Sequence, residues 1–302
     1  MRYFFHFWRH KPLIFLALLV VLGCAQKDRN RTSRKEALME KEIDTTSLLL
    51  KYNDNLFSIP SPYQAAYVIR KHQVHFNQRL LNDPAFYTRY TTNFKKALNI
   101  GIYGTDLGYL SIFSGEKRSL EYFSVIRKLS EDLRLHNALS STDITNLKHS
   151  LTRQDSMIHY LTQAYRKFDA YLIKNERKKI GALILAGGWV ESTYILSRTV
   201  LQTQKRPLVN RLGQQKHALE NLIELLSSYY YDSEKYTELI DALVDIAYEF
   251  DGVIYNYYYK EPLVKEKQKL TIVRSTSNVV ISEYHLRSIA KKISKLRNKI
   301  TT

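Results

Sequence analysis

The chain has 302 residues, of which 44% are apolar, and its 46 lysines and arginines against 29 acids give a net charge of +17. This much apolar sequence can bury a large core, so a chain that is disordered throughout is excluded. The single cysteine, Cys24, excludes a disulfide framework and a zinc site built from several cysteines. With only 10 glycines and 6 prolines, the chain has few breaks, which is consistent with one large helical body.

The first 23 residues have the layout of a bacterial signal peptide. Three positive charges and no acid precede an uncharged run over residues 12–23. This run is shorter than the roughly 20 apolar residues that a membrane-spanning helix needs. It ends in Val21-Leu22-Gly23-Cys24, which resembles the lipobox of bacterial lipoproteins. The resemblance implies cleavage before Cys24 and lipid on its sulfur, which would hold the mature protein on a membrane.

The residues after Cys24 bear on the destination. An aspartate directly after the lipidated cysteine resembles an inner-membrane retention signal of some proteobacteria. This chain has Ala25 at that position, so we expect the protein at the outer membrane. Surface-displayed Bacteroidota lipoproteins usually have several acids here, whereas this chain has only Asp28. A periplasm-facing and a surface-facing orientation therefore both stay open.

The mature chain divides into three segments. Residues 24–58 are polar and predict a flexible tether. Residues 59–258 predict a helical domain, because apolar residues recur there at spacings of three and four. Its helices are expected from Pro62 onward, from Asp83-Pro84 through to 113, and over about 117–133, 155–173, 177–204, 210–230 and 232–255.

The third segment, residues 259–302, is basic and ends in an amphipathic helix that begins after Ser282, an N-cap residue. Apolar residues alternate on either side of 274–278 and predict a short β-hairpin with its turn there. The whole pattern predicts an all-α fold, either a multi-helix bundle or an irregular helical array, with this hairpin near the carboxyl terminus.

Two glycine-containing motifs stand out in the helical domain. They read Gly101-Ile102-Tyr103-Gly104-Thr105-Asp106-Leu107-Gly108-Tyr109 and Ala186-Gly187-Gly188-Trp189-Val190-Glu191. Through them the body resembles an uncharacterised family of helical Bacteroidota lipoproteins. This resemblance implies no activity.

Three carboxylates, Asp106, Asp169 and Glu191, lie on helix faces that are otherwise apolar or glycine-rich. Buried acids need partners or a shifted pKa, so three converging acids would form a ligand, cation or general acid/base site. The alternative is that each accepts a hydrogen bond from a tyrosine, an arginine or a helix terminus, and we take this as the default. No motif predicts a metal site or a cofactor.

The basic excess is concentrated near the carboxyl terminus, where residues 260–299 hold 11 positive charges and 3 acids. Because the signal peptide exports the chain, nucleic acid is not the expected partner. We expect Lys291, Lys292, Lys295, Tyr257 and Tyr258 to bind an acidic envelope polymer or a protein. A solvated helix face and tyrosines that fill the core are the alternatives.

These patterns together predict a lipid-anchored protein of the cell envelope with a non-enzymatic binding or scaffold role. The alternative is an envelope hydrolase or ligand-binding protein that uses the buried carboxylates. The sequence names neither an activity nor a partner.

Overall fold

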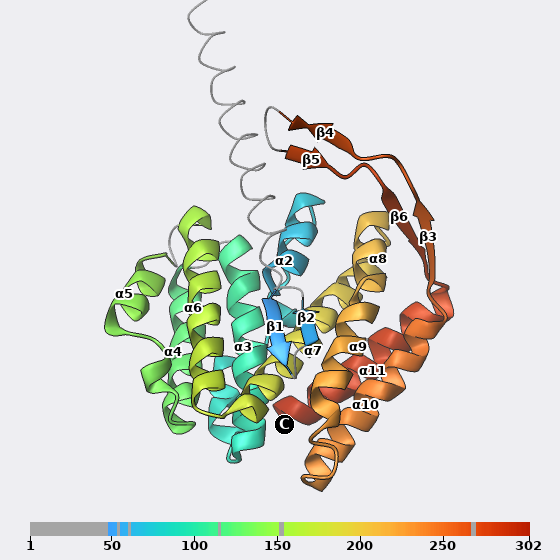
Figure 1. Cartoon of the computed structure of the whole chain (residues 1–302). Coiled ribbons are helices and arrows are strands. Elements are labelled where there is room, and N and C mark those ends of the chain that lie inside the picture. The colour runs from blue at the N-terminus through green and yellow to red at the C-terminus, as the bar shows by residue number, and fades with distance from the viewer. Residues whose placement is uncertain (1–47, 53–54, 60–61, 114–115, 151–153, 267–269) are drawn as a thin grey trace, which may run out of the picture. The chain divides into compact units, whose positions relative to one another are not determined.

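The computed structural model describes residues 48–52, 55–59, 62–113, 116–150, 154–266 and 270–302 (Figure 1). All of them belong to one compact unit, Thr46–Thr302. The expected signal peptide, Cys24 and most of the expected tether lie outside the described residues.

Helices dominate the described residues. They are α2 (Pro62–Lys71), α3 (Asn93–Phe113), α4 (Glu116–Asp132), α5 (Ser141–Ser150), α6 (Gln154–Lys174), α7 (Lys178–Thr203), α8 (Arg206–Gly213), α9 (Gln215–Ser227), α10 (Glu234–Asp251) and α11 (Glu283–Thr301). Three short 3₁₀ helices join them: η1 (Gln78–Leu80), η2 (Pro84–Arg89) and η3 (His136–Ala138).

Strands occur in the described residues only as antiparallel pairs. These are β1 (Leu48–Tyr52) with β2 (Asn55–Ile59), β3 (Ile254–Tyr258) with β6 (Thr276–Val280), and β4 (Leu263–Lys265) with β5 (Leu270–Ile272). The predicted all-α fold with a short hairpin near the carboxyl terminus is therefore confirmed. The pair β1–β2, apart from Ile59, lies within residues 24–58, where the sequence was expected to form a flexible tether.

The centre of the fold is the contact between α3 and α7, which pack against each other more extensively than any other two helices. A Cβ atom at Gly101 would overlap the carbonyl oxygen of Ile184, and one at Gly187 would overlap the carbonyl oxygen of Leu98. The two glycine motifs thus let the helix backbones touch. Around this pair, α2 and α4 pack on α3, α9 and α11 pack on α7, and α10 packs on α9 and α11.

Among the described residues, α7 is the one helix long and apolar enough to cross a membrane. However, 78% of its most apolar stretch is buried inside the fold. The central helix of a packed core has this same composition, so its length and hydropathy are weak evidence for a membrane span.

The helix boundaries differ from the predicted ones where the chain turns to meet a neighbour. Asp83 caps the amide of Ala85 as expected, but the first turns are the 3₁₀ helix η2, and α3 begins only at Asn93. The cause is Tyr90, which is buried beside Tyr103 and accepts a hydrogen bond from Asn82. The chain therefore leaves the helical path between η2 and α3.

The expected helix over 210–230 is interrupted at Gln214, between α8 and α9. The preceding residue, Gly213, lies against Val279 of β6, whose side chain would overlap a Cβ atom there. The helix expected over 232–255 ends at Asp251, after which the chain enters β3. Helix α11 begins at Glu283 with Ser282 as its N-cap, as predicted.

The carboxyl-terminal hairpin is longer than expected and has a different turn. Strand β6 runs through most of the predicted turn over 274–278 and pairs with β3, while β5 pairs with β4, so the predicted turn position is wrong. The register places Tyr258 opposite Thr276 and Leu263 opposite Ile272. Residues 259–262 therefore lie opposite residues 273–275 without strand pairing, and the two pairs form separate ladders. We call residues 254–280 the β-arm.

Candidate functional site

Two of the three predicted carboxylates come together in the core. Asp106 of α3 and Glu191 of α7 are both 0% exposed, and Arg297 of α11 forms an ion pair with Glu191. Arg297 donates from Nε to Oε2 of Glu191 over 2.6 Å and from Nη2 to Oε1 over 2.8 Å. Charge-assisted pairs of this forked geometry are strong and directional, so this one joins α7 to α11. Asp169 lies on α6, but its side chain is outside the described part of the structure.

The surroundings of Asp106 favour the protonated form of its carboxyl. Burial raises the pKa of this carboxyl well above its usual range, and the adjacent Glu191 raises it further, while Arg297 acts in the opposite direction. Its Oδ2 accepts a hydrogen bond of 3.0 Å from the amide of Asn82. Its Oδ1 accepts none from the described residues. This oxygen is therefore the one that can carry the proton and donate toward Glu191.

The loop that contains η1 and leads into η2 is held by Asp106 directly and by Glu191 through Arg297. Arg297 donates from Nη2 to the carbonyl of Leu80 over 3.2 Å, while Asp106 accepts from the amide of Asn82. Buried tyrosines hold the same loop: Tyr122 donates to the carbonyl of Asn82 over 2.8 Å, Tyr103 donates to that of Asp83 over 2.8 Å, and Tyr109 accepts from the amide of Asn77 over 3.2 Å. Burial raises the pKa of all three tyrosines.

This arrangement matches the default interpretation of the two acids. Each carboxylate has a partner that the fold requires, and neither has any solvent-accessible surface. General acid/base chemistry needs the acid within hydrogen-bond reach of a substrate atom, which this packing does not provide. Among the described residues, no group of three or more histidines, cysteines and acids could hold a metal ion.

The basic carboxyl-terminal helix is partly neutralised by α10. Lys292 forms ion pairs with Asp245 over 2.8 Å and with Glu249 over 2.7 Å. Although burial opposes its charged form, these two acids raise the pKa of Lys292. The other two predicted lysines, Lys291 and Lys295, are exposed and form no ion pair with a described residue. Only these two of the three predicted lysines remain free to attract an acidic partner.

The base of the β-arm is fixed to the helices. Tyr255 and Val279 are register partners on the face that meets α8. The hydroxyl of Tyr255 donates to the carbonyl of Gly213, and the amide of Val279 donates to Oδ1 of Asn210 over 3.2 Å. Burial raises the pKa of Tyr255 to about 12. These contacts hold the base of the arm in place against α8.

Beyond this base the β-arm is exposed. The predicted binding residues Tyr257 and Tyr258 are 66% and 52% exposed, and Tyr259 is 70% exposed. The other apolar residues of the arm with exposed side chains are Ile254, Leu263, Val264, Leu270, Val273 and Val280. Figure 1 shows β3–β6 continuing into β4–β5 as one ribbon that starts where α10 ends. Large exposed apolar patches on soluble proteins mark interaction sites.

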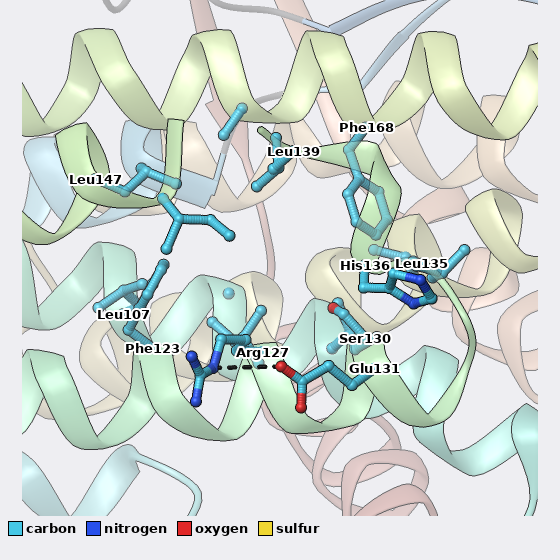
Figure 2. Close-up of a pocket in the computed structure, with 16 residues that line it drawn as sticks. Leu107, Phe123, Arg127, Ser130, Glu131, Leu135, His136, Leu139, Leu147 and Phe168 are labelled. Carbon is cyan, nitrogen blue, oxygen red and sulfur yellow. Dashed lines mark ion pairs between the residues drawn. The ribbon is translucent and has the colours of Figure 1, made fainter. Parts of the chain in front are cut away.

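An apolar cavity between α3, α4, α5, α6 and α7 was not predicted from the sequence (Figure 2). Its lining includes Leu107, Phe123, Leu147 and Phe168. Each of these residues has the spacing of an ordinary core position. No local pattern therefore distinguishes a cavity wall from a filled core.

No family model, no curated protein and no solved structure matches the chain.

Proposed function

We propose that this chain is a lipid-anchored protein of the bacterial cell envelope whose β-arm binds a protein partner. In this proposal Cys24 carries the lipid and the protein resides at the outer membrane, as the resemblance of Val21–Cys24 to a lipobox suggests. The helical unit is a scaffold that fixes the base of the arm. The observation that supports the binding role best is the row of exposed tyrosines and aliphatic residues on a ribbon anchored at one end.

The chemistry of the β-arm favours a protein over a polymer. Each described strand of the arm pairs with another strand on one side only, so its other edge presents amide and carbonyl groups to a partner, except at Val279, whose amide donates to Asn210. An extended segment of a partner can pair with such an edge, and the alternating side chains then supply specificity. Tyrosines contribute large contact areas at low entropic cost and are enriched at interfaces.

The positive charge of the β-arm and of α11 indicates the charge of the partner surface. Residues 254–280 include five lysines and arginines and two glutamates, a net charge of +3. On α11, Lys291 and Lys295, which form no ion pair with a described residue, are spaced to lie on one helix face with Tyr284, which is 71% exposed. A partner with an acidic rim around an apolar groove or strand edge would complement both features.

The carboxylates support a scaffold role. Asp106 and Glu191 are used to hold the loop over 77–83 and helix α11, as described above. A hydrolase would need at least one of them accessible to substrate. The proposed function is therefore binding without catalysis.

A site-specific crosslinking experiment tests this proposal. A photoreactive phenylalanine analogue replaces Tyr257 or Tyr258 in the full-length protein expressed in intact cells. The control is Tyr231, which is 94% exposed. It precedes α10, whereas the β-arm follows α10, and this 18-residue helix is about 27 Å long. We expect one protein adduct from positions 257 and 258 and none from 231. Identical adducts from all three, or adducts to lipid or polysaccharide alone, would contradict the proposal.

A second experiment tests the charge contribution. Replacing Lys291 and Lys295 together by glutamate should weaken capture of the crosslinked partner and remove its dependence on salt. Lys292 is left unchanged because it has structural ion pairs with α10. Unchanged capture at low salt would show that α11 takes no part in binding.

A further inference from the structure

The cavity between α3 and α7 and the α4–α6 layer has a volume of about 200 Å³. Sixteen described residues line it, and twelve of these are apolar or glycine. Leu107 and Leu147, on opposite walls, are buried, and Figure 2 shows both at the same end of the cavity. Apolar cavities destabilise a fold in proportion to their volume, and a ligand that fills one restores the missing contacts.

The polar lining residues are Arg127, Ser130, Glu131 and His136. Figure 2 shows Ser130, Glu131 and His136 together at the end away from Leu107 and Leu147. Glu131 and His136 are exposed, so this end of the cavity faces solvent; Arg127, which lies nearer to Leu107 and Phe123, is exposed as well. The cavity therefore has an apolar interior and a polar end, which is the polarity pattern of a single-chain amphiphile.

Arg127, the one lysine or arginine among the described lining residues, favours a negative head group. Arg127 contacts Glu131 through Nε only, over 3.5 Å, and this exposed pair is weak. The terminal guanidinium nitrogens of Arg127 form no ion pair with a described residue, and they can bind a carboxylate in the forked geometry that arginine prefers. Figure 2 shows the imidazole of His136 at the other end of the cavity, beside Ser130 and Glu131, so it does not lie with Arg127.

We infer that this cavity binds a medium-chain fatty acid, with the acyl chain in the apolar interior and the carboxylate at Arg127. The volume sets the chain length. An apolar cavity of 150 Å³ in another protein accepts benzene, with six carbons, so 200 Å³ corresponds to about eight carbons. This inference does not depend on the β-arm, and neither result decides the other.

Chain length gives the first test, with the purified full-length protein and isothermal titration of hexanoate, octanoate and hexadecanoate. Each methylene that enters the cavity should tighten binding about fourfold, the fold-change equivalent to ~0.8 kcal/mol. We therefore expect octanoate to bind more than tenfold tighter than hexanoate. The additional methylenes of hexadecanoate should not each tighten binding by this factor. No saturable binding of octanoate, or binding that keeps tightening at the same rate to hexadecanoate, would overturn the inference.

Two matched pairs of variants give the second test. Ala164→Leu places a larger side chain on the cavity wall, while Ala170→Leu makes the same change at an exposed position of the same helix. Ala164→Leu should weaken octanoate binding at least tenfold, and Ala170→Leu should leave it unchanged. Arg127→Gln should likewise weaken octanoate binding, whereas Lys128→Gln, at the exposed neighbouring position, should not. Binding of octan-1-ol should be the same in these two variants.

If Ala164→Leu fails to fold by circular dichroism, the chain-length series on the unmodified protein and the Arg127→Gln comparison still decide the matter. Octan-1-ol binding as tightly as octanoate to the unmodified protein would overturn the assignment of a carboxylate head group. Equal octanoate affinity in folded Ala164→Leu and Ala170→Leu would overturn the cavity as the site.

Discussion

Arg297 donates two hydrogen bonds to Glu191, one from Nε and one from Nη2, and so joins α11 to α7. The two residues are 106 positions apart in the sequence. The same guanidinium stacks over the ring of Tyr194, 4.4 Å from its centroid. Burial opposes a charged guanidinium, but Glu191 raises the pKa of Arg297. The fold therefore relies on a buried ion pair whose two members stabilise each other.

Removing one member of this pair should be costly. We expect Arg297→Met, or Glu191→Met, to lower the free energy of unfolding by about 3–5 kcal/mol, because each leaves a charge buried without its partner. The double variant should lose much less than the sum of the two, since it buries no charge. Urea unfolding of the purified full-length protein measures all three values, and additive losses would argue against a coupled pair.

Asp106 is expected to tolerate one substitution and not another. Asp106→Asn keeps an oxygen for the amide of Asn82 and an N–H in place of the carboxyl proton, so it should fold with near-normal stability. Asp106→Leu leaves that buried amide unpaired and should cost about 1–3 kcal/mol. The comparison is made by urea unfolding at pH 5. A large loss in Asp106→Asn would indicate that Asp106 is ionised in the folded protein.

The pH dependence of stability follows from the same residue. Because the folded pKa of Asp106 is raised, the folded state binds a proton that the unfolded state releases above about pH 4. The contribution of Asp106 is fully present below the unfolded pKa and is lost as pH rises through the folded pKa. Asp106→Asn should remove this loss, so its stability should fall less than that of the unmodified protein as pH rises from 4. Parallel curves would contradict this assignment.

The sequence was sufficient to place most helices, because packing of amphipathic faces leaves a local three- and four-residue pattern. It also led to Asp106 and Glu191 as buried acids. Their partner Arg297 was counted only as part of a basic segment, since its distance from Glu191 in space depends on how α11 packs. Helix α5 was missed because it is short and polar. Its reciprocal cap between Ser140 and Asp143 is visible in the sequence and would have indicated its start.

Contacts that depend on several elements were beyond the sequence. The turn of the β-arm was misplaced because alternating apolar residues fit more than one register when both faces of a ribbon are exposed. The cavity requires five helices to be arranged first. The basic helix looked free to bind an acidic polymer, yet Lys292 and Lys299 pair with acids of α10.

The glycines at the α3–α7 contact should be intolerant of alanine. Gly101→Ala and Gly187→Ala each place a Cβ atom into a backbone carbonyl, so the helices must separate. We expect each to cost ~2 kcal/mol or more, despite the roughly 1 kcal/mol gain in helix propensity. Gly181→Ala in α7 is the control, because its Cβ would lie 3.3 Å from the flexible end of Leu172. Thermal unfolding measures the difference, and equal midpoints in all three variants would refute close backbone contact.

Glu249 should make the fold sensitive to acid. Hydrogen bonds from Lys292 and His285 lower the pKa of Glu249, against the opposing effect of burial. Its contribution is present above the unfolded pKa and is lost as pH falls through the folded pKa. Glu249→Gln should therefore lower the free energy of unfolding at pH 7 by about 1 kcal/mol, a figure that allows for solvent screening of this cluster. Below pH 5, the stability of this variant should fall less steeply than that of the unmodified protein. Glu283→Gln, at an exposed pair with Arg287, should change stability by less than about 0.5 kcal/mol.

The proposed lipid anchor can be tested at Cys24. In cells given a labelled fatty acid, the full-length protein should incorporate label, and Cys24→Ser should not, because the thiol is the only cysteine sulfur available for acylation. The variant should also shift from the membrane fraction to the soluble fraction. Its thermal unfolding should match that of the anchored protein, because the helical unit begins at Thr46. Label retained by Cys24→Ser, or an unlabelled unmodified protein, would show that Cys24 is not the attachment point.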